Sequence, residues 1–185
     1  MNALRRALCI ALCCVTSLAA QAIPDAARGY AESWRTQGRG EMRWFGFRLY
    51  AAELWVGAAA TTGTTATTAR FDPDQVFALK LTYARDFSAD RLVSTSIEEM
   101  QRLGNVDAAQ ARRWQSDLTR VFPDVKQGEV ITGVYLPGRG AAFFHQGKLT
   151  GELTDPVLAK SFFNIWLDPR TRAPELRSQL LGLRE

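Results

Sequence analysis

The segment 38–55, GRGEMRWFGFRLYAAELW, places arginines among aromatic residues and could therefore bind an anion. If residues 41–56 form one extended strand, Arg43 lies on the same face as two phenylalanines and a leucine. A guanidinium surrounded by aromatic side chains is suited to a carboxylate or an enolate, which it binds through two parallel hydrogen bonds. We therefore expect Arg43 to anchor a ligand head group. The alternative is that Arg43 reaches solvent or pairs with Glu41 or Asp86.

Aromatic residues supply the rest of the candidate binding site. The hydroxyls of Tyr50 and Tyr83 could hydrogen-bond the head group of a ligand, although buried tyrosines also commonly satisfy backbone groups. We expect the apolar part of the ligand to contact Phe45, Phe47, Phe87, Phe162 and Trp166. The alternative for the run 162–167, FFNIWL, is that it only packs a helix on a sheet.

The sequence gives no sign of a metal site, a cofactor site or a hydrolytic active site. His145 is the only histidine; it is a weak candidate for a metal or haem ligand, and a single imidazole cannot build a zinc site. The sequence contains no G-x-S-x-G motif, no phosphate-binding loop and no H-E-x-x-H motif. We therefore expect neither a metal nor a cofactor.

Residues 1–22 predict a secretory signal peptide. They contain two arginines, then an uncharged apolar run, then a small-x-small triplet that ends at Ala22. Cleavage after Ala22 would leave residues 23–185 as a single domain, exported to the periplasm or secreted. All three cysteines fall within residues 1–22, so the processed chain would have no disulfide and no thiolate metal site.

Charge and hydropathy limit the classes of partner. Cleavage would also remove Arg5 and Arg6, leaving 21 basic residues against 19 acidic ones, a balance that argues against nucleic-acid binding. No segment after residue 22 approaches the roughly 20 apolar residues that a membrane-spanning helix needs, so we expect no stable membrane anchor. The sequence does not determine the oligomeric state.

Hydrophobic periodicity predicts an α+β fold. Strands are expected at 41–56 and 76–83, followed by two helices that begin after Ser88 and Asp107. Three short strands are then expected at 128–137, 141–146 and 148–154. Two more helices are expected at 156–167 and 174–181. This order predicts an antiparallel sheet that is covered by helices on one face.

Four motifs, taken together, resemble the bacterial, exported branch of the chalcone-isomerase-like proteins. They are G-x-G-x-x-R-x-x-G-F-x-x-Y at 38–50, FPDVKQGEV at 122–130, FFHQGKLTGEL at 143–153 and SFFNIWLDPRT at 161–171. The resemblance covers nearly the whole chain after residue 22. It implies the chalcone isomerase fold, in which an open-faced antiparallel sheet and a layer of α-helices enclose a ligand cleft. Members include plant isomerases that close a flavanone ring, plastid fatty-acid-binding proteins and proteins without shown catalysis.

The resemblance implies that the plant isomerase site is largely missing. Four polar residues of the plant isomerase site align with Phe45, Phe87, Asp90 and Ser94 of this sequence. Only a threonine near the end of the plant sequences has a counterpart here, which is Thr150. Ring closure needs hydrogen-bond donors that polarise an enone carbonyl, and phenylalanine cannot donate. We therefore expect no chalcone closure by this protein, despite the fold.

The fatty-acid-binding members imply a different role for the first motif. In those proteins an arginine shortly after G-x-G holds the ligand carboxylate, and this register falls on Met42, one residue before Arg43. A local bulge near Gly40 would bring Arg43 onto the corresponding face.

Two functions are consistent with these residues. The first is a non-catalytic periplasmic protein that binds a small apolar ligand, fatty-acid-like or aromatic, through an acidic or carbonyl head group. The second is an intramolecular lyase or isomerase of unknown substrate, with Arg43 as electrophile and Tyr83 or Thr150 as its partner. A carbon-lined pocket with one guanidinium favours binding, and convergent donors at its floor favour catalysis. A cleft filled by its own aromatic side chains would indicate a structural or interaction domain.

Overall fold

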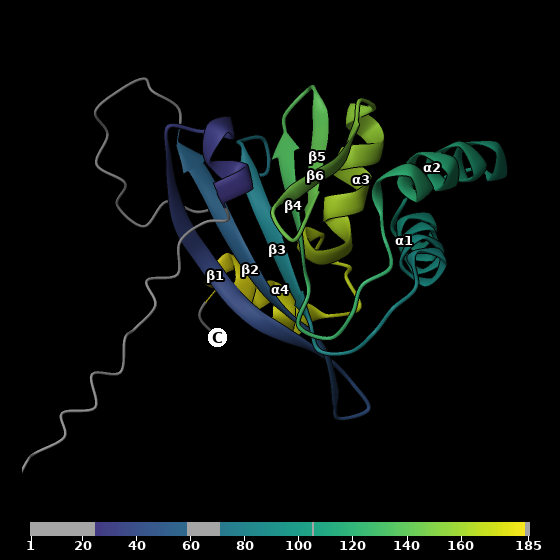
Figure 1. Ribbon diagram of the computed structural model, residues 1–185, viewed down its shortest axis with the longest axis horizontal. Helices are drawn as coiled ribbons and strands as arrows, with labels where there is room; N and C mark the ends of the chain where they lie inside the picture. The colour runs from purple at the N-terminus through teal and green to yellow at the C-terminus, as the bar shows by residue number, and fades with distance from the viewer. Residues whose placement is uncertain (1–24, 59–70, 105, 184–185) are drawn as a thin grey trace, which may run out of the picture.

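Six antiparallel strands form one sheet, in which each strand pairs with the next one along the sequence (Figure 1). The strands are β1 (Ser33–Trp44), β2 (Phe47–Ala58), β3 (Phe77–Tyr83), β4 (Val130–Leu136), β5 (Gly140–His145) and β6 (Lys148–Leu153). The computed structural model describes residues 25–58, 71–104 and 106–183. The predicted signal peptide lies outside these residues.

A two-residue turn separates β1 from β2, where the sequence predicts one continuous strand over 41–56. Phe45 and Gly46 both have positive φ angles, 47° and 81°, and Trp44 pairs directly with Phe47 across the turn. Positive φ at both central residues is the geometry of a tight hairpin whose twist matches that of its strands. The prediction of a single strand is therefore wrong, because the chain reverses direction at Phe45.

The four helices are confirmed, together with three of their predicted caps. They are α1 (Ala89–Leu103), α2 (Ala108–Val121), α3 (Pro156–Leu167) and α4 (Pro174–Leu181). The side-chain oxygens of Ser88, Asp107 and Asp155 each accept a backbone N–H from the first turn of α1, α2 and α3, respectively. Gly182 ends α4 in the left-handed conformation, as glycine readily does.

Helices cover one face of the sheet, which confirms the predicted α+β layout (Figure 1). Helix α4 packs on β1 and β2, and α3 packs on β4, β5 and β6. Helix α1 lies against α3 and α2, and α2 also reaches β6. A short 3-10 helix, η1 (Asp25–Tyr30), covers part of the opposite face, where Ala27 packs in a smaller apolar cluster with Trp55 and Phe144. Among the described residues, no helix is long and apolar enough to cross a bilayer.

The glycines of the G-x-G motif let α4 approach β1 closely. A Cβ atom at Gly38 would lie 2.1 Å from the carbonyl oxygen of Gln179 and 2.5 Å from that of Leu180. Both are backbone atoms of α4, so they can move only if the whole helix moves. The motif therefore has a packing role in this protein.

Replacing Gly38 with alanine should lower the free energy of unfolding by about 3 kcal/mol, because the helix must shift to accommodate the methyl group. Urea unfolding followed by circular dichroism measures the change. Gly29→Ala is the control, since a Cβ there would have no neighbour within 4 Å. A Gly38→Ala variant as stable as the wild type would show that the contact with α4 does not limit this position.

Candidate functional site

A cavity of about 340 Å³ lies between the inner face of the sheet and helices α1 and α3. This volume is at the lower end of the range of small-molecule sites, about 300–1,000 Å³. Most of the lining is apolar and includes Met42, Leu49, Leu79, Leu81, Leu92, Phe122, Ile131, Phe143, Phe163 and Ile165. The cleft is therefore not filled by its own aromatic side chains, which was one of the alternatives left open by the sequence.

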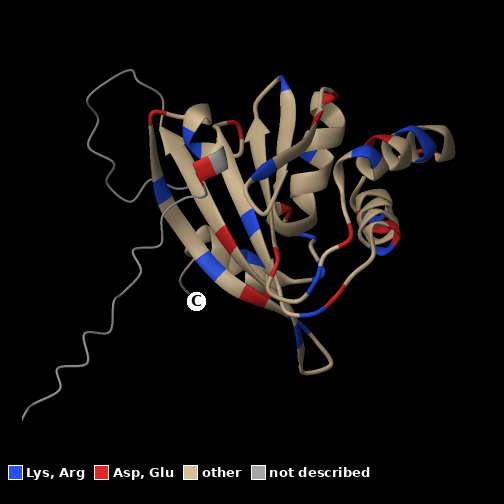
Figure 2. Cartoon of the chain, viewed as in Figure 1, with Lys and Arg blue, Asp and Glu red and all other residues tan. Residues whose placement is uncertain are grey.

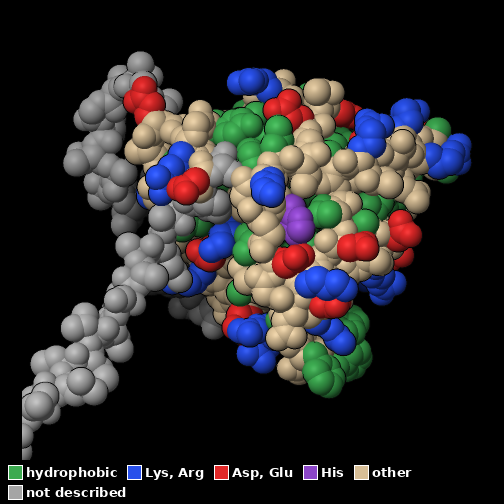
Figure 3. Space-filling view, in the orientation of Figure 1, with side chains coloured by type: hydrophobic (Ala, Val, Ile, Leu, Met, Phe, Trp, Pro, Cys, Tyr) green, Lys and Arg blue, Asp and Glu red, His purple; other side chains and the backbone are tan. Residues whose placement is uncertain are grey.

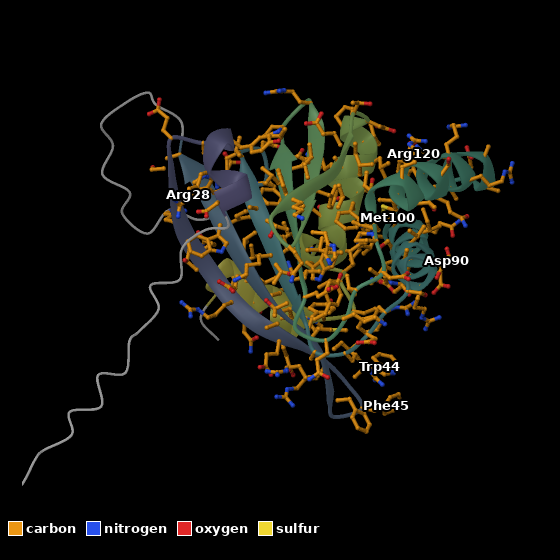
Figure 4. The ribbon with its side chains drawn as sticks, viewed as in Figure 1. Arg28, Trp44, Phe45, Asp90, Met100 and Arg120 are labelled. Carbon is orange, nitrogen blue, oxygen red and sulfur yellow. The ribbon has the colours of Figure 1, made fainter. Side chains whose placement is uncertain are left out.

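Exposed lining residues mark the mouth of the cavity. Trp44, at the end of β1, is 55% exposed, and Arg91 and Thr95, on α1, are also exposed. Arg172, which follows α3, is exposed and lines the same cavity. The mouth thus opens between the β1–β2 hairpin and the α1 side of the molecule. Figure 4 shows Trp44 and Phe45 at the end of this hairpin and Asp90 and Met100 along α1.

Two tyrosines place hydroxyl groups in this apolar cavity. Tyr50 on β2 and Tyr83 on β3 are paired across the strands, and their ring centroids lie 6.1 Å apart. The Tyr50 hydroxyl accepts a hydrogen bond of 2.9 Å from the indole N–H of Trp166, which leaves its own proton to donate. Within the described part of the chain, the Tyr83 hydroxyl has no hydrogen-bond partner.

Burial makes both tyrosines harder to deprotonate. It raises the pKa of Tyr50 to about 12, partly offset by the hydrogen bond from Trp166, and it raises the pKa of Tyr83 as well. At neutral pH the two hydroxyls can therefore donate hydrogen bonds to a ligand oxygen, but neither is tuned to accept a proton as a general base.

Three other polar side chains of the lining, those of Ser96, Glu99 and Thr171, already have partners inside the protein. The hydroxyls of Ser96 and Thr171 donate to the carbonyl oxygens of Leu92 and Ile165, at 2.8 and 2.7 Å. Glu99 pairs with two arginines, Arg102 at 2.8 Å and Arg172 at 3.1 Å. The hydroxyls of Tyr50 and Tyr83 are thus the donors best placed to meet a ligand inside the cavity.

A family model described as chalcone isomerase-like matches residues 15–182. The chain belongs to the chalcone isomerase-like family. The solved structure of a fatty-acid binding protein from Arabidopsis thaliana has a similar fold, with a TM-score of 0.61 and 13% sequence identity. The match covers 82% of this chain and 88% of the Arabidopsis chain. No curated protein sequence matches this one significantly.

Five of the predicted site residues line the cavity of this chalcone isomerase-like protein. They are Tyr50, Tyr83, Phe87, Phe162 and Trp166. Tyr83 and Phe87 are in edge-to-face contact, with ring centroids 5.7 Å apart, and Phe162 and Trp166 make a similar contact at 5.3 Å. The structure therefore brings these residues together, and their role in ligand binding stays a prediction.

Arg43 does not face the cavity, and this expectation is corrected. Its exposed guanidinium pairs with Glu41 at 2.7 Å, and Glu41 also pairs with Arg48 at 3.0 Å. Hydrogen bonds from Arg48 and then Arg43 lower the pKa of the Glu41 carboxyl. Met42 and Trp44, its two neighbours on β1, line the cavity, and Arg43 between them points to the other face of the strand. The alternative interpretation of Arg43, an ion pair with Glu41, is what the structure shows.

Phe45, Phe47 and Thr150 also lie outside the cavity lining. Phe45 and Phe47 are 86% and 68% exposed, because Phe45 lies in the β1–β2 turn and Phe47 is the first residue of β2 after it. Thr150 lies on β6 and donates its hydroxyl to the carbonyl oxygen of Phe143 at 3.2 Å. These three residues are therefore not positioned to contact a ligand inside the cavity.

Several lining residues were missed from the sequence. Leu79 and Leu81 share a strand face with Tyr83, so the period-two pattern of β3 could have identified them. Leu92, Thr95 and Ser96 lie on one side of α1 at helical spacing, but their mixed polarity hides the pattern. Such a mixture is expected where a helix borders a cavity mouth.

His145 has a structural partner. Its Nε2 atom lies 2.9 Å from an Oε2 atom of Glu129, which also accepts the backbone N–H of Lys126 at 2.9 Å. The backbone hydrogen bond and then the histidine lower the pKa of the Glu129 carboxyl. In the described segments, no group of three histidine, cysteine or acidic side chains is arranged to hold a metal ion.

Proposed function

We propose that this protein binds a small apolar ligand with an acidic or carbonyl head group in the cavity between the sheet and helices α1 and α3. The observation that carries the proposal is an open, carbon-lined cavity of about 340 Å³ with two tyrosine hydroxyls inside it. A ligand that buries its hydrocarbon there gains roughly 0.8 kcal/mol per methylene group removed from water. The name of the Arabidopsis protein, a fatty-acid binding protein, supports the same class of ligand.

Tyr50 and Tyr83 are the residues that we propose for the head group. A carbonyl or carboxyl oxygen placed between them could accept two O–H hydrogen bonds in a place shielded from water. Arg91, at the mouth, adds a cation for an anionic head group that stays near solvent. Arg43 has no part in this arrangement, since its guanidinium lies outside the cavity.

The second candidate function is an intramolecular lyase or isomerase. It is favoured by the same two hydroxyls, which could polarise a substrate carbonyl. However, the raised pKa values of Tyr50 and Tyr83 make both residues poor bases at neutral pH. Binding without catalysis therefore fits the cavity better.

Titration with a fluorescent fatty acid tests the proposed roles of the tyrosines. Tyr50→Phe and Tyr83→Phe should each weaken binding about fivefold, which corresponds to about 1 kcal/mol for one lost hydrogen bond. Each substitution keeps the ring, so the apolar lining is preserved.

Arg43→Met is the matched control for the titration, because it removes a charge that lies near the cavity without lining it. Its affinity should equal that of the wild type. No binding by the wild type would contradict the proposed function. If Arg43→Met binds more weakly and the tyrosine variants bind as the wild type does, the ligand head group lies at the hairpin rather than between the tyrosines.

We also propose that the protein is exported, to the periplasm or the medium, after cleavage behind Ala22. The intact mass of protein recovered from the secreted fraction should then correspond to a chain that begins at Ile23 and has no free thiol. A mass that retains residues 1–22 would contradict the cleavage.

A further inference from the structure

Three large apolar side chains are exposed together at the end of the β1–β2 hairpin. Trp44, Phe45 and Phe47, which we call the aromatic tip, are 55%, 86% and 68% exposed. Figure 1 shows the hairpin extending beyond the helices, and Figure 3 shows a hydrophobic patch at that end of the molecule. Contiguous exposed apolar surface of this kind is uncommon on soluble proteins and usually marks an interaction site.

The backbone holds the aromatic tip in this exposed position. Phe45 has a φ angle of 47°, which bulky residues rarely adopt, and the next residue, Gly46, has a φ of 81°. The Trp44 and Phe45 rings contact each other edge to face, with centroids 5.1 Å apart and planes at 84°. The tight turn thus displays a phenylalanine where an asparagine or aspartate is more usual. Packing within the fold does not explain this choice.

Basic residues surround the tip. Arg43 and Arg48 share a single carboxylate, that of Glu41, so the hairpin carries an excess positive charge (Figure 2). Arg85 follows β3 at the same end of the sheet, where the N–H of Ala84 bonds to the carbonyl of Leu49. Arg85 is exposed and has no ion pair among the described residues.

The tip is continuous with the mouth of the cavity. Trp44 belongs both to the tip and to the cavity lining, and Arg91 lies in the lining on the other side of the mouth, on α1. Any surface that receives the aromatic tip would therefore be brought close to the entrance through which a ligand passes.

We propose that the aromatic tip inserts into the headgroup region of an anionic lipid bilayer and places the cavity mouth there for exchange of the apolar ligand. Aromatic rings partition into the membrane interface, and nearby arginines are attracted to anionic headgroups. A projecting tip of three aromatic side chains suits insertion between lipids better than docking on a protein, which needs a broader surface. Docking requires only the tip and its arginines, whereas exchange rests on the proposed ligand-binding function.

Co-sedimentation with lipid vesicles tests the docking step. The full-length protein should bind vesicles of phosphatidylcholine and phosphatidylglycerol more tightly than vesicles of phosphatidylcholine alone. The double variant Phe45→Ser/Phe47→Ser should bind the anionic vesicles at least about tenfold more weakly, because it loses two aromatic rings from the interface. The double variant Arg43→Gln/Arg48→Gln should have an affinity for anionic vesicles that is lower by about fivefold or more. Its affinity for neutral vesicles should change little. The apolar N-terminal segment is the same in every variant, so differences between them arise at the hairpin.

The variants separate docking from ligand binding, because Phe45 and Phe47 lie outside the cavity. Phe45→Ser/Phe47→Ser should bind the fluorescent fatty acid in solution as the wild type does, yet extract it from vesicles more slowly. Equal vesicle binding by the wild type and this variant would overturn the proposal. Self-association that the variant abolishes, without vesicle binding by the wild type, would also overturn it and assign the tip to a second copy of the chain. Vesicle binding that depends on the tip, without any fatty-acid binding, would support docking and refute only the proposed function.

Discussion

Replacing Phe163 with alanine is expected to lower the free energy of unfolding by about 3–5 kcal/mol. Phe163 is 2% exposed and lies at the centre of a cluster of rings. Its ring contacts Phe77 edge to face at 5.0 Å, Phe162 at 5.4 Å and Tyr135 at 5.7 Å. Because the site already borders a cavity, the neighbours are poorly placed to fill the space that the ring leaves.

Urea unfolding of Phe163→Ala and Phe45→Ala provides a matched comparison, because both variants remove the same side chain. Phe45 is 86% exposed at the turn, so its removal should change the free energy of unfolding by less than about 0.5 kcal/mol. A Phe45→Ala variant as unstable as Phe163→Ala would mean that the hairpin end is buried in the native protein.

Replacing Leu92 with tryptophan is expected to weaken fatty-acid binding by about 100-fold or more. Leu92 lines the cavity from α1, near its mouth, and the larger indole would occupy space that the ligand needs. Excluding three or four methylene groups from the cavity removes about 2.4–3.2 kcal/mol of binding energy, which corresponds to a factor of about 100. The stability of the fold should be nearly unchanged, since the added ring fills an existing space.

Gln101→Trp is the control for Leu92→Trp, because Gln101 is exposed on the same helix and does not line the cavity. It adds an indole to α1 without blocking the site. Fluorescence titration should show wild-type affinity for Gln101→Trp. Equal binding by wild type and Leu92→Trp would place the ligand outside the cavity.

The helices could be predicted from the sequence because their signals are local. Ser88, Asp107 and Asp155 cap the helices that follow them, and each cap is made within three residues of the capping side chain. Strand β3 could be predicted equally well, because Phe77, Leu79, Leu81 and Tyr83 recur at every second residue along it. The resemblance to chalcone-isomerase-like proteins predicted how these helices and strands are arranged, and the family match confirms that resemblance.

The first hairpin could not be predicted in the same way. A tight turn of this kind usually has the sequence Asn-Gly or Asp-Gly. Here the turn is Phe45-Gly46, and it lies within an aromatic run whose pattern predicts one continuous strand. Missing the turn changed the inferred surroundings of every residue near it. Arg43 was therefore expected in the cavity, and Phe45 and Phe47 in its lining, although all three are exposed at the hairpin end.

Tyr83, Phe162 and Trp166 were found because the elements that carry them were predicted correctly. Tyr83 lies on β3, and Phe162 and Trp166 lie one turn apart on α3, so periodicity alone directs them to the interior. The pairing of Tyr50 with Tyr83 depends on the register between β2 and β3, which no local signal sets. The sequence alone therefore could not predict that the Tyr50 and Tyr83 hydroxyls lie near each other in the cavity.

Native mass spectrometry of the wild-type protein and Leu92→Trp, both purified from the organism's own cells, tests the central claim most directly. The proposed function predicts one small apolar acid or carbonyl compound bound per wild-type chain, and its loss from Leu92→Trp. The same adduct on both proteins, or a wild-type chain that carries no ligand and takes up no added fatty acid, would contradict it.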